Sequence, residues 1–420
     1  MLSLPDILHI CPSTKRLWVA YSGGLDSHVL LHLLAQSDLQ LRAIHINHGL
    51  NPDADYWAEH CLKVCKQLGV ICHVVKVKVE VAARESLEAK ARTARYQAII
   101  DTIAPDDVVL TAQHADDQAE TLLLQLLRGS GVAGLAAMPE DKGWLIRPLL
   151  RYTRAELYEY AQAANLQWIE DSSNADTRFD RNFLRHEIMP RLQQRWASVS
   201  HIISRAASHQ AEANELIQDL AELDLQQCQG NKPDILNLDT LSKLSSARQS
   251  NVLRFWIKKL ALPSPTTKQL QQILNNLITA KADSQPLVSW QGAEIRRYRQ
   301  HLFAMPPLPS STKNIKWLFP TPSPRLPLGN LKLTQAKGLA LPGGTELEIR
   351  FRQGGEVIRL NKHQRVVKKL LQAAGLPPWQ RKFIPMIFLK NVLIAIPGIG
   401  VADGFLADEN GWNIEWIYSL

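Results

Sequence analysis

The stretch LWVAYSGGLDSHVLLHLL, at residues 17–34, decides the fold of this 420-residue chain. Its first part is a short apolar run typical of a strand, and after Asp26 the apolar residues recur at helical spacing. Between the two lies the string Ser-Gly-Gly-Leu-Asp-Ser. The stretch therefore predicts a strand, a glycine-containing loop and a helix in direct succession.

The loop has the chemistry of a phosphate site. Two glycines let the backbone adopt positive φ angles and approach a ligand closely. The free N–H groups and the dipole of a helix N-terminus attract negative charge, and Ser22 and Ser27 add hydroxyl groups. A carboxylate at Asp26 would repel a phosphate unless a divalent cation lay between them, so we expect Asp26 to bind Mg²⁺. The alternative is a plain tight turn with Asp26 as a helix cap.

The string is not a Walker loop, because no Gly-Lys-Ser/Thr follows the glycines. It resembles the SGGxDS motif of the PP-loop, or N-type ATP pyrophosphatase, superfamily, whose members cleave ATP between the α and β phosphates and adenylate a substrate oxygen. The motif leaves the substrate open. The resemblance implies that ATP binds at six consecutive residues, namely Ser22, Gly23, Gly24, Leu25, Asp26 and Ser27.

Composition predicts a globular protein with a basic surface. Hydrophobic residues make up 45% of the chain and charged residues 21%, with a net charge of +8, which suits a polyanionic partner without proving one. Five cysteines without a Cys-x-x-Cys argue against a disulfide framework, zinc or an iron–sulfur cluster. The apolar run at 384–399 is interrupted by prolines and a lysine, which predicts a hairpin. We expect a cytoplasmic protein without a membrane partner.

Element order predicts an α/β chain of several domains. Strands alternate with helices from residue 15 to about 170, which predicts a parallel sheet covered on both faces, with ligand sites at the carboxyl ends of its strands. We predict an N-terminal parallel-sheet domain of the adenine-nucleotide α-hydrolase (PP-loop) type at 1–215, a small, mainly helical middle domain at 216–305, a proline-rich linker at 306–330 and a C-terminal α+β domain at 331–420.

A second motif, HADDQAET at residues 114–121, follows the predicted strand at 108–112. Asp117 and Glu120 are three residues apart, so one helical face presents two carboxylates beside the phosphate loop. Such a pair suits a small cationic substrate or Mg²⁺. The alternative is that acidic residues simply complement the helix N-terminus.

Basic residues gather at three further places. Arg92 and Arg95 lie three apart on one helical face, although a solvated surface explains either arginine equally well. Arg181 and Arg185 lie four apart, which allows the pair to clamp a phosphate, and the alternative for their segment is a loop with a helix cap. Residues 359–390 carry eight Lys or Arg and no acid, which favours contact with a phosphate backbone. The candidate contacts of this segment to such a backbone are Lys368, Lys369 and Arg381, and Trp379 either stacks on a base or packs in a core.

The chain carries, in order, the loop at 22–27, the motif at 114–121, Arg-Gly-Ser-Gly at 128–131, the polar cluster at 171–185 and the basic segment at 359–390. These motifs and their order resemble those of the tRNA(Ile)-lysidine synthase family. The resemblance implies an ATP- and Mg²⁺-dependent ligase. It would join L-lysine to carbon-2 of the wobble cytidine of the CAU-anticodon isoleucine tRNA through an adenylated cytidine, releasing AMP and pyrophosphate and changing codon reading from AUG to AUA. Asp26 and Asp117 would be catalytic, Asp117 and Glu120 would hold lysine, and tRNA would contact the basic residues named above.

Two other functions stay open. A PP-loop tRNA sulfurtransferase would use the same adenylation, although the chain lacks the usual Cys-x-x-Cys. A non-catalytic, nucleotide-gated RNA-binding protein would not need the acidic motif beside the loop. The sequence leaves the oligomeric state open, with a homodimer as one alternative.

Overall fold

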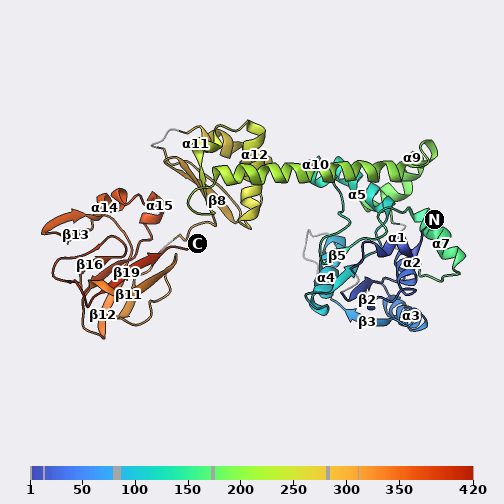
Figure 1. Ribbon diagram of the computed structural model, residues 1–420, viewed down its shortest axis with the longest axis horizontal. Coiled ribbons are helices and arrows are strands. Elements are labelled where there is room, and N and C mark those ends of the chain that lie inside the picture. The colour runs from blue at the N-terminus through green and yellow to red at the C-terminus, as the bar shows by residue number, and fades with distance from the viewer. Residues whose placement is uncertain are drawn as a thin grey trace. The chain divides into compact units, whose positions relative to one another are not determined.

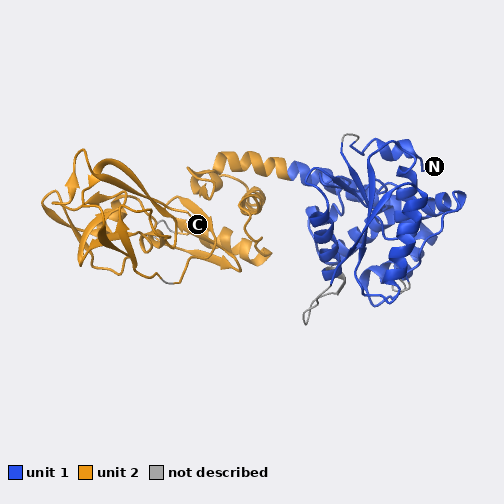
Figure 2. Ribbon diagram, turned by 90° about the horizontal axis from the view of Figure 1, so that it is seen from below, with its two compact units in different colours: residues 1–217 blue, residues 218–420 orange. Residues whose placement is uncertain are grey.

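The computed structural model describes residues 2–12, 15–78, 87–171, 176–280, 284–310 and 312–419, except for the side chains of 87–89. Part of the polar cluster expected at 171–185, residues 172–175, lies outside the described residues. The chain divides into two units, residues 1–217 and 218–420 (Figures 1 and 2). Within the described residues, no helix is both long and apolar enough to cross a membrane.

The first unit contains a five-stranded sheet in the order β3-β2-β1-β4-β5. All neighbouring strands pair in parallel, as the sequence predicted. The chain runs outward from β1 through β2 to β3 and then returns to the other side of β1 as β4, so a topological switch point lies between β1 and β4. The strands are β1 (Leu17–Ala20), β2 (Leu41–Asn47), β3 (Ile71–Lys76), β4 (Val108–Leu110) and β5 (Leu145–Ile146).

Helices cover both faces of this sheet. Leu17 and Val19 of β1 pack into one apolar cluster with the helix α2, whereas Trp18 packs into a second cluster on the opposite face, as expected for a central parallel strand. The helical segments of the first unit are α1 (Leu4–Leu8), α2 (Leu25–Leu34), α3 (Ala54–Gln67), α4 (Leu87–Thr102), α5 (Ala115–Leu127), α6 (Val132–Leu135), α7 (Arg154–Ala163), α8 (Asp180–Phe183), the π-helical η2 (Leu184–Ile188), α9 (Met189–Arg195) and the start of α10 (Val199–Cys228).

The second unit begins with a helical module around the buried Trp256. The module also contains a four-stranded antiparallel sheet, in the order β6-β9-β8-β7. The elements of this module are β6 (Ile235–Asn237), α11 (Leu238–Leu241), α12 (Ser246–Lys259), α13 (Thr267–Gln272), η3 (Ile273–Ile278), β7 (Leu287–Trp290), β8 (Ala293–Tyr298) and β9 (His301–Met305).

The rest of the second unit is mainly antiparallel sheet with two short helices. One sheet has the order β10-β12-β15-β16-β17 and another β18-β11-β19, and β13 pairs with β14. The elements are β10 (Ile315–Phe319), β11 (Asn330–Leu339), β12 (Thr345–Arg350), β13 (Val357–Leu360), β14 (His363–Val366), α14 (Val367–Ala373), α15 (Pro378–Arg381), β15 (Met386–Leu389), β16 (Val392–Ile396), β17 (Gly400–Val401), β18 (Leu406–Ala407) and β19 (Trp412–Ile417).

Two local expectations for this region can be compared with the structure. The hairpin expected at 384–399 is formed by β15 and β16, which pair in antiparallel fashion. The proline-rich stretch at 306–330 contains the strand β10, which pairs with β12. Because the prolines flank rather than interrupt residues 315–319, those five residues keep every backbone N–H needed for a ladder.

Candidate active site

The loop after β1 has a backbone that only glycine fits at Gly23. Its φ angle is +87°, and a Cβ atom at this position would lie 2.9 Å from Ile169 Cδ1 and 3.1 Å from Cys61 Sγ. The Ile169 amide donates a hydrogen bond to the Gly23 carbonyl at 2.9 Å. The segment around residue 169 therefore packs directly against the loop, a contact that sequence spacing did not reveal.

The hydroxyl groups of the loop face its own backbone at the start of α2. Ser22 Oγ and Ser27 Oγ hydrogen-bond to each other at 3.0 Å, and Ser27 Oγ donates to the Gly24 carbonyl at 3.1 Å. Gly24 is the N-cap of α2, so the unpaired N–H groups of the first helical turn lie beside these hydroxyls. The free N–H groups of this turn and the loop at 22–27 form a cradle whose chemistry suits a phosphate.

His114 links this loop to the acidic motif on α5. It is the N-cap residue of α5 and follows β4, the strand that pairs with β1 in the sheet. Its Nε2 atom is 3.8 Å from Asp26 Oδ2 and 3.5 Å from Asp117 Oδ2, and its Nδ1 atom is 3.5 Å from Asp116 Oδ2. Burial alone would lower the pKa of His114, but the carboxylates of Asp117, Asp116 and Asp26 outweigh it and raise that pKa to about 9. At neutral pH His114 is therefore a cation.

Asp26 has the features of a metal-binding carboxylate. Its Oδ1 atom is buried and receives no hydrogen bond from the described part of the chain. Burial raises the pKa of Asp26, and the nearby His114 cation opposes that rise. Among the described residues no group of three or more His, Cys, Asp or Glu side chains is ready to hold a metal. The residues thus fit a Mg²⁺ ion held by one carboxylate together with substrate phosphates and water.

Four charged side chains, Asp117, Glu120, Arg181 and Arg185, form a cluster that we call the charged quartet. Arg181 donates from Nε to Glu120 Oε2 at 2.8 Å and from Nη2 to Asp117 Oδ1 at 2.9 Å. Arg185 donates from Nε to Glu120 Oε1 at 2.7 Å and from Nη2 to Asp117 Oδ1 at 2.9 Å. The sequence placed the acids on one helical face, but it assigned the arginines to tRNA and did not reveal this pairing.

The quartet is layered. The side chains of Asp117 and Glu120 are only 12% and 2% exposed, whereas those of Arg181 and Arg185 are 26% and 27% exposed. Burial alone would raise the pKa of Asp117, but the cations of His114, Arg181 and Arg185 lower it below the ordinary value. Asp117 is therefore ionised, and the two arginines are more exposed than the two acids.

The neighbouring Asp116 has a different task. It accepts hydrogen bonds from the Arg154 amide at 2.8 Å and from Ser200 Oγ at 2.7 Å. Burial alone would raise the pKa of Asp116, but hydrogen bonds from His114, Arg154 and Ser200 lower it well below the ordinary value. Asp116 thus connects α5 to α7 and α10 through hydrogen bonds. Asp117, in contrast, contacts His114 and the two arginines of the charged quartet.

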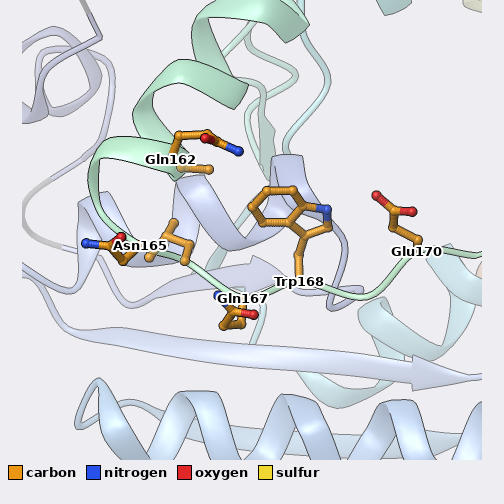
Figure 3. Close-up of a pocket in the computed structure, with 7 residues that line it drawn as sticks. Gln162, Asn165, Gln167, Trp168 and Glu170 are labelled. Carbon is orange, nitrogen blue, oxygen red and sulfur yellow. The ribbon is translucent and has the colours of Figure 1, made fainter.

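A pocket of about 300 Å³ lies in the first unit and shares no residue with the loop at 22–27 or with the charged quartet. Figure 3 shows it along the segment that leaves α7, with Trp168 and Glu170 on its wall. Its lining is mostly amide and aromatic side chains.

Three family models match the chain. They describe a PP-loop domain at residues 5–192, a TilS substrate binding domain at 236–303 and a TilS substrate C-terminal domain at 347–416. A protein of Coxiella burnetii named tRNA(Ile)-lysidine synthase is 43% identical over 96% of this chain and 93% of its own length. The chain belongs to the tRNA(Ile)-lysidine synthase family. A Legionella pneumophila protein of the same name is 41% identical, with 95% of each chain covered.

A solved structure, the U34-tRNA thiolase NcsA of Methanococcus maripaludis, matches 50% of this chain and 77% of its own. Its sequence identity is 16% and its TM-score 0.42. A likeness of this size carries no argument about the substrate of a tRNA(Ile)-lysidine synthase family member.

The basic pair on α4 lies near the end of β2. Arg95 Nε donates to His48 Nε2 at 3.3 Å, and the Arg92 guanidinium lies 5.2 Å from the centre of the Tyr96 ring. Burial, with a contribution from Arg95, lowers the pKa of His48 to about 4, so His48 is a neutral acceptor. In this family member His48 therefore positions Arg95 at the carboxyl edge of the sheet.

The basic residues of the second unit divide into two groups. Lys368 and Lys369 are exposed on α14. Arg381 instead lies inside, where its Nε donates to the Leu376 carbonyl at 2.6 Å and its Nη2 to Tyr298 Oη at 3.1 Å. Trp379 is 8% exposed and packs in a cluster with Phe303, at a ring distance of 5.2 Å. Of the two alternatives for Trp379, the structure favours core packing.

Proposed function

We propose that this tRNA(Ile)-lysidine synthase family member is an ATP-dependent carbon–nitrogen ligase that joins L-lysine to carbon-2 of the wobble cytidine of the CAU-anticodon isoleucine tRNA. One observation carries the proposal. A continuous set of titratable side chains runs from Asp26 in the PP-loop through His114 to Asp117 in the charged quartet. Nucleotide chemistry and amine recognition would thus share one site at the switch point of the sheet.

The first step would be adenylation of the base. The donors of residues 22–27 would hold the phosphates of ATP while the carbon-2 oxygen of the cytidine attacks the α-phosphorus and pyrophosphate leaves. Bound Mg²⁺, held by Asp26, would supply positive charge against the leaving phosphates. The His114 cation, 3.8 Å from Asp26, would keep that carboxylate ionised and oriented.

The second step would be attack by lysine. The neutral ε-amine would add to carbon-2, AMP would leave with the former base oxygen, and the nitrogen would lose a proton. Asp117 would act here by binding and orienting the amino acid. A His114 imidazolium with a pKa near 9 already holds its proton at neutral pH, so we assign it an electrostatic role rather than that of a base.

Exposed cations would hold the tRNA. Lys368 and Lys369 on α14 are exposed and suit contact with a phosphate backbone. Arg92 and Arg95 on α4 would contact the part of the tRNA that reaches the carboxyl edge of the parallel sheet. Arg381, which is turned inward, would support α15 rather than touch a phosphate.

The test uses radiolabelled lysine, ATP with Mg²⁺ and two transcripts of the isoleucine tRNA, one with cytidine and one with uridine at the wobble position. We expect label in the cytidine transcript only, and its loss in Asp26→Asn. AMP formation that requires a sulfur donor instead of lysine would indicate a sulfurtransferase. Tight tRNA binding without ATP cleavage would indicate a nucleotide-gated binding protein.

A further inference from the structure

The sheet of the helical module in the second unit is covered differently on its two faces. Ile295 of β8 belongs to the apolar cluster of the module, so its face of the sheet packs on the module's own helices. Because side chains alternate along a strand, Arg296 and Tyr298 lie on the opposite face. Phe303 of β9 pairs with Arg296 in register and shares this second face. Its aromatic and charged side chains can therefore meet another part of the chain.

The helix α15, in the C-terminal part of the second unit (residues 312–419), packs on this second face. The ring of Trp379 lies 5.2 Å from that of Phe303 and 6.2 Å from that of Tyr298, in edge-to-face geometry in both cases. Trp379 and Phe303 belong to one buried apolar cluster. Edge-to-face aromatic pairs stabilise a contact beyond the area that they bury. A buried indole thus docks α15 on the module.

Two arginines cross this contact in opposite directions. The guanidinium carbon of Arg296, on the module, lies 5.5 Å from the centre of the Trp379 ring, and Glu294 holds the same guanidinium through hydrogen bonds of 2.8 and 3.2 Å. The guanidinium carbon of Arg381, on α15, lies 5.9 Å from the centre of the Tyr298 ring, and Arg381 Nη2 donates to Tyr298 Oη at 3.1 Å. Each side supplies one cation and one aromatic ring. We call these four residues, Arg296, Tyr298, Trp379 and Arg381, the seam.

Arg381 also connects the seam to the basic helix α14. Its Nε atom donates to the Leu376 carbonyl at 2.6 Å, and the Leu376 amide donates to the Leu371 carbonyl of α14 at 3.2 Å. The exposed Lys368 and Lys369 lie on the same helix α14. A continuous set of contacts therefore runs from β8 through α15 to these two lysines.

We propose that the seam holds the C-terminal part on the helical module and thereby positions Lys368 and Lys369 for tRNA, which makes Trp379 and Arg381 positioning residues. This inference rests on the proposed function. An open seam would give α14 more freedom of movement on the connection at 306–314, which lowers the effective concentration of its lysines at a tRNA that the rest of the protein holds. A closed seam fixes the lysines before tRNA binds, so that binding costs less conformational entropy.

Burial distinguishes this role from a direct contact with RNA. Arg381 is 9% exposed and Trp379 is 8% exposed. To reach a phosphate, the Arg381 guanidinium would have to leave both Tyr298 and the Leu376 carbonyl. The next residue, Lys382, is exposed and carries the same charge. It is therefore the matched control for the loss of a cation at this end of α15.

A first measurement reports on the seam without RNA. Tyr298→Phe removes the hydroxyl that accepts the hydrogen bond from Arg381 and keeps the ring. The amides of Arg381 and Phe383 donate to the carbonyls of Pro377 and Gln380. We expect these amides to exchange at least about threefold faster in Tyr298→Phe, because a substitution on the module reaches α15 only through the seam. Unchanged hydrogen exchange in α15 would overturn the inference.

A second measurement follows the binding of the isoleucine tRNA. Arg381→Gln should raise Kd about 5- to 10-fold and leave the slope of log K against log[salt] unchanged, because no phosphate contact is lost. The kcat of ligation at saturating tRNA should stay within about threefold. Adding Tyr298→Phe to Arg381→Gln should weaken binding by no more than a further twofold or so, since both act on one contact. The effects of Lys382→Gln and Tyr298→Phe should instead be additive.

A direct contact of Arg381 with RNA would give a different pattern. The salt slope would fall by about 1 in Arg381→Gln, and Tyr298→Phe would add its own independent loss. Arg381→Lys would also keep most of the affinity, whereas the seam requires the planar guanidinium and predicts a loss close to that of Arg381→Gln. Any of these three results would overturn the inference.

The outcomes separate the inference from the proposed function. If Arg381→Gln does not fold, Tyr298→Phe alone decides, with an expected rise in Kd of at least about threefold and an unchanged Kd as the opposing result. No incorporation of lysine by the unmodified protein would overturn the proposed function. The hydrogen exchange of α15 and the Kd for tRNA would still decide the inference, because neither requires lysine.

Discussion

The first unit should lose stability as pH rises from 6 to 9.5, because His114 loses its proton over this range. The pKa of about 9 in the folded protein lies above the ordinary 6.5 because Asp117, Asp116 and Asp26 outweigh the effect of burial. A group whose pKa is raised by folding stabilises the fold fully below its unfolded pKa, and this stabilisation is lost as pH rises through the folded pKa. The difference between the ordinary pKa of 6.5 and the folded pKa of about 9 corresponds to about 3 kcal/mol of stabilisation of the folded first unit by protonated His114.

Replacement by His114→Gln removes the titrating group. We expect the free energy of unfolding of the variant to lie below that of the unmodified protein at pH 6, and the gap to narrow by about 3 kcal/mol by pH 9.5. Amide hydrogen exchange of the β1 and β4 peptides measures this gap in the first unit alone, because comparison at equal pH cancels the intrinsic exchange rates. His209→Gln, at a side chain 66% exposed on α10, is the control. A gap that stays constant with pH would refute the reasoning.

Three further variants test other parts of the structure. Gly23→Ala should abolish nucleotide binding and lower the stability of the fold by roughly 1–2 kcal/mol or more, because φ is +87° and the new Cβ would lie 2.9 Å from Ile169. Calorimetry with an ATP analogue measures the affinity. An unchanged affinity would refute the assignment of this loop as the phosphate cradle. Lys368→Gln with Lys369→Gln should weaken tRNA binding and reduce the slope of log K against log[salt] by about 1–2, which salt-dependent binding curves would show. Trp379→Ala should lower the stability of the second unit by about 3–5 kcal/mol in urea unfolding, whereas a solvent-facing base-stacking residue would cost almost nothing.

The sequence was informative where a local pattern has one structural solution. The alternation of apolar strands and helices predicted the parallel sheet, and the strand–loop–helix string around Gly23 and Asp26 predicted the phosphate cradle. The hairpin at 384–399 followed from its interrupted apolar run. These features depend on residues close in the chain, so their geometry is set by backbone dihedral angles and by periodicity.

Spacing was less informative about partners. It placed Asp117 and Glu120 on one helical face and gave Arg181 and Arg185 a phosphate role, but it could not show that the four side chains meet, since more than sixty residues separate the acids from the arginines. Spacing also gave no indication that Asp116, next to Asp117, accepts a hydrogen bond from Ser200 on α10.

The sequence by itself determined the family, the sheet and the nucleotide loop, because motif and periodicity act over a few residues. Only the tertiary structure decided which charges neutralise each other, which acid faces the site, and that Arg381 and Trp379 lie inside while Lys368 and Lys369 lie outside. The physical reason is that ion pairing and burial depend on distances between elements remote in the chain. A helical pattern specifies the face on which a side chain lies, and the packing of the fold supplies its neighbour.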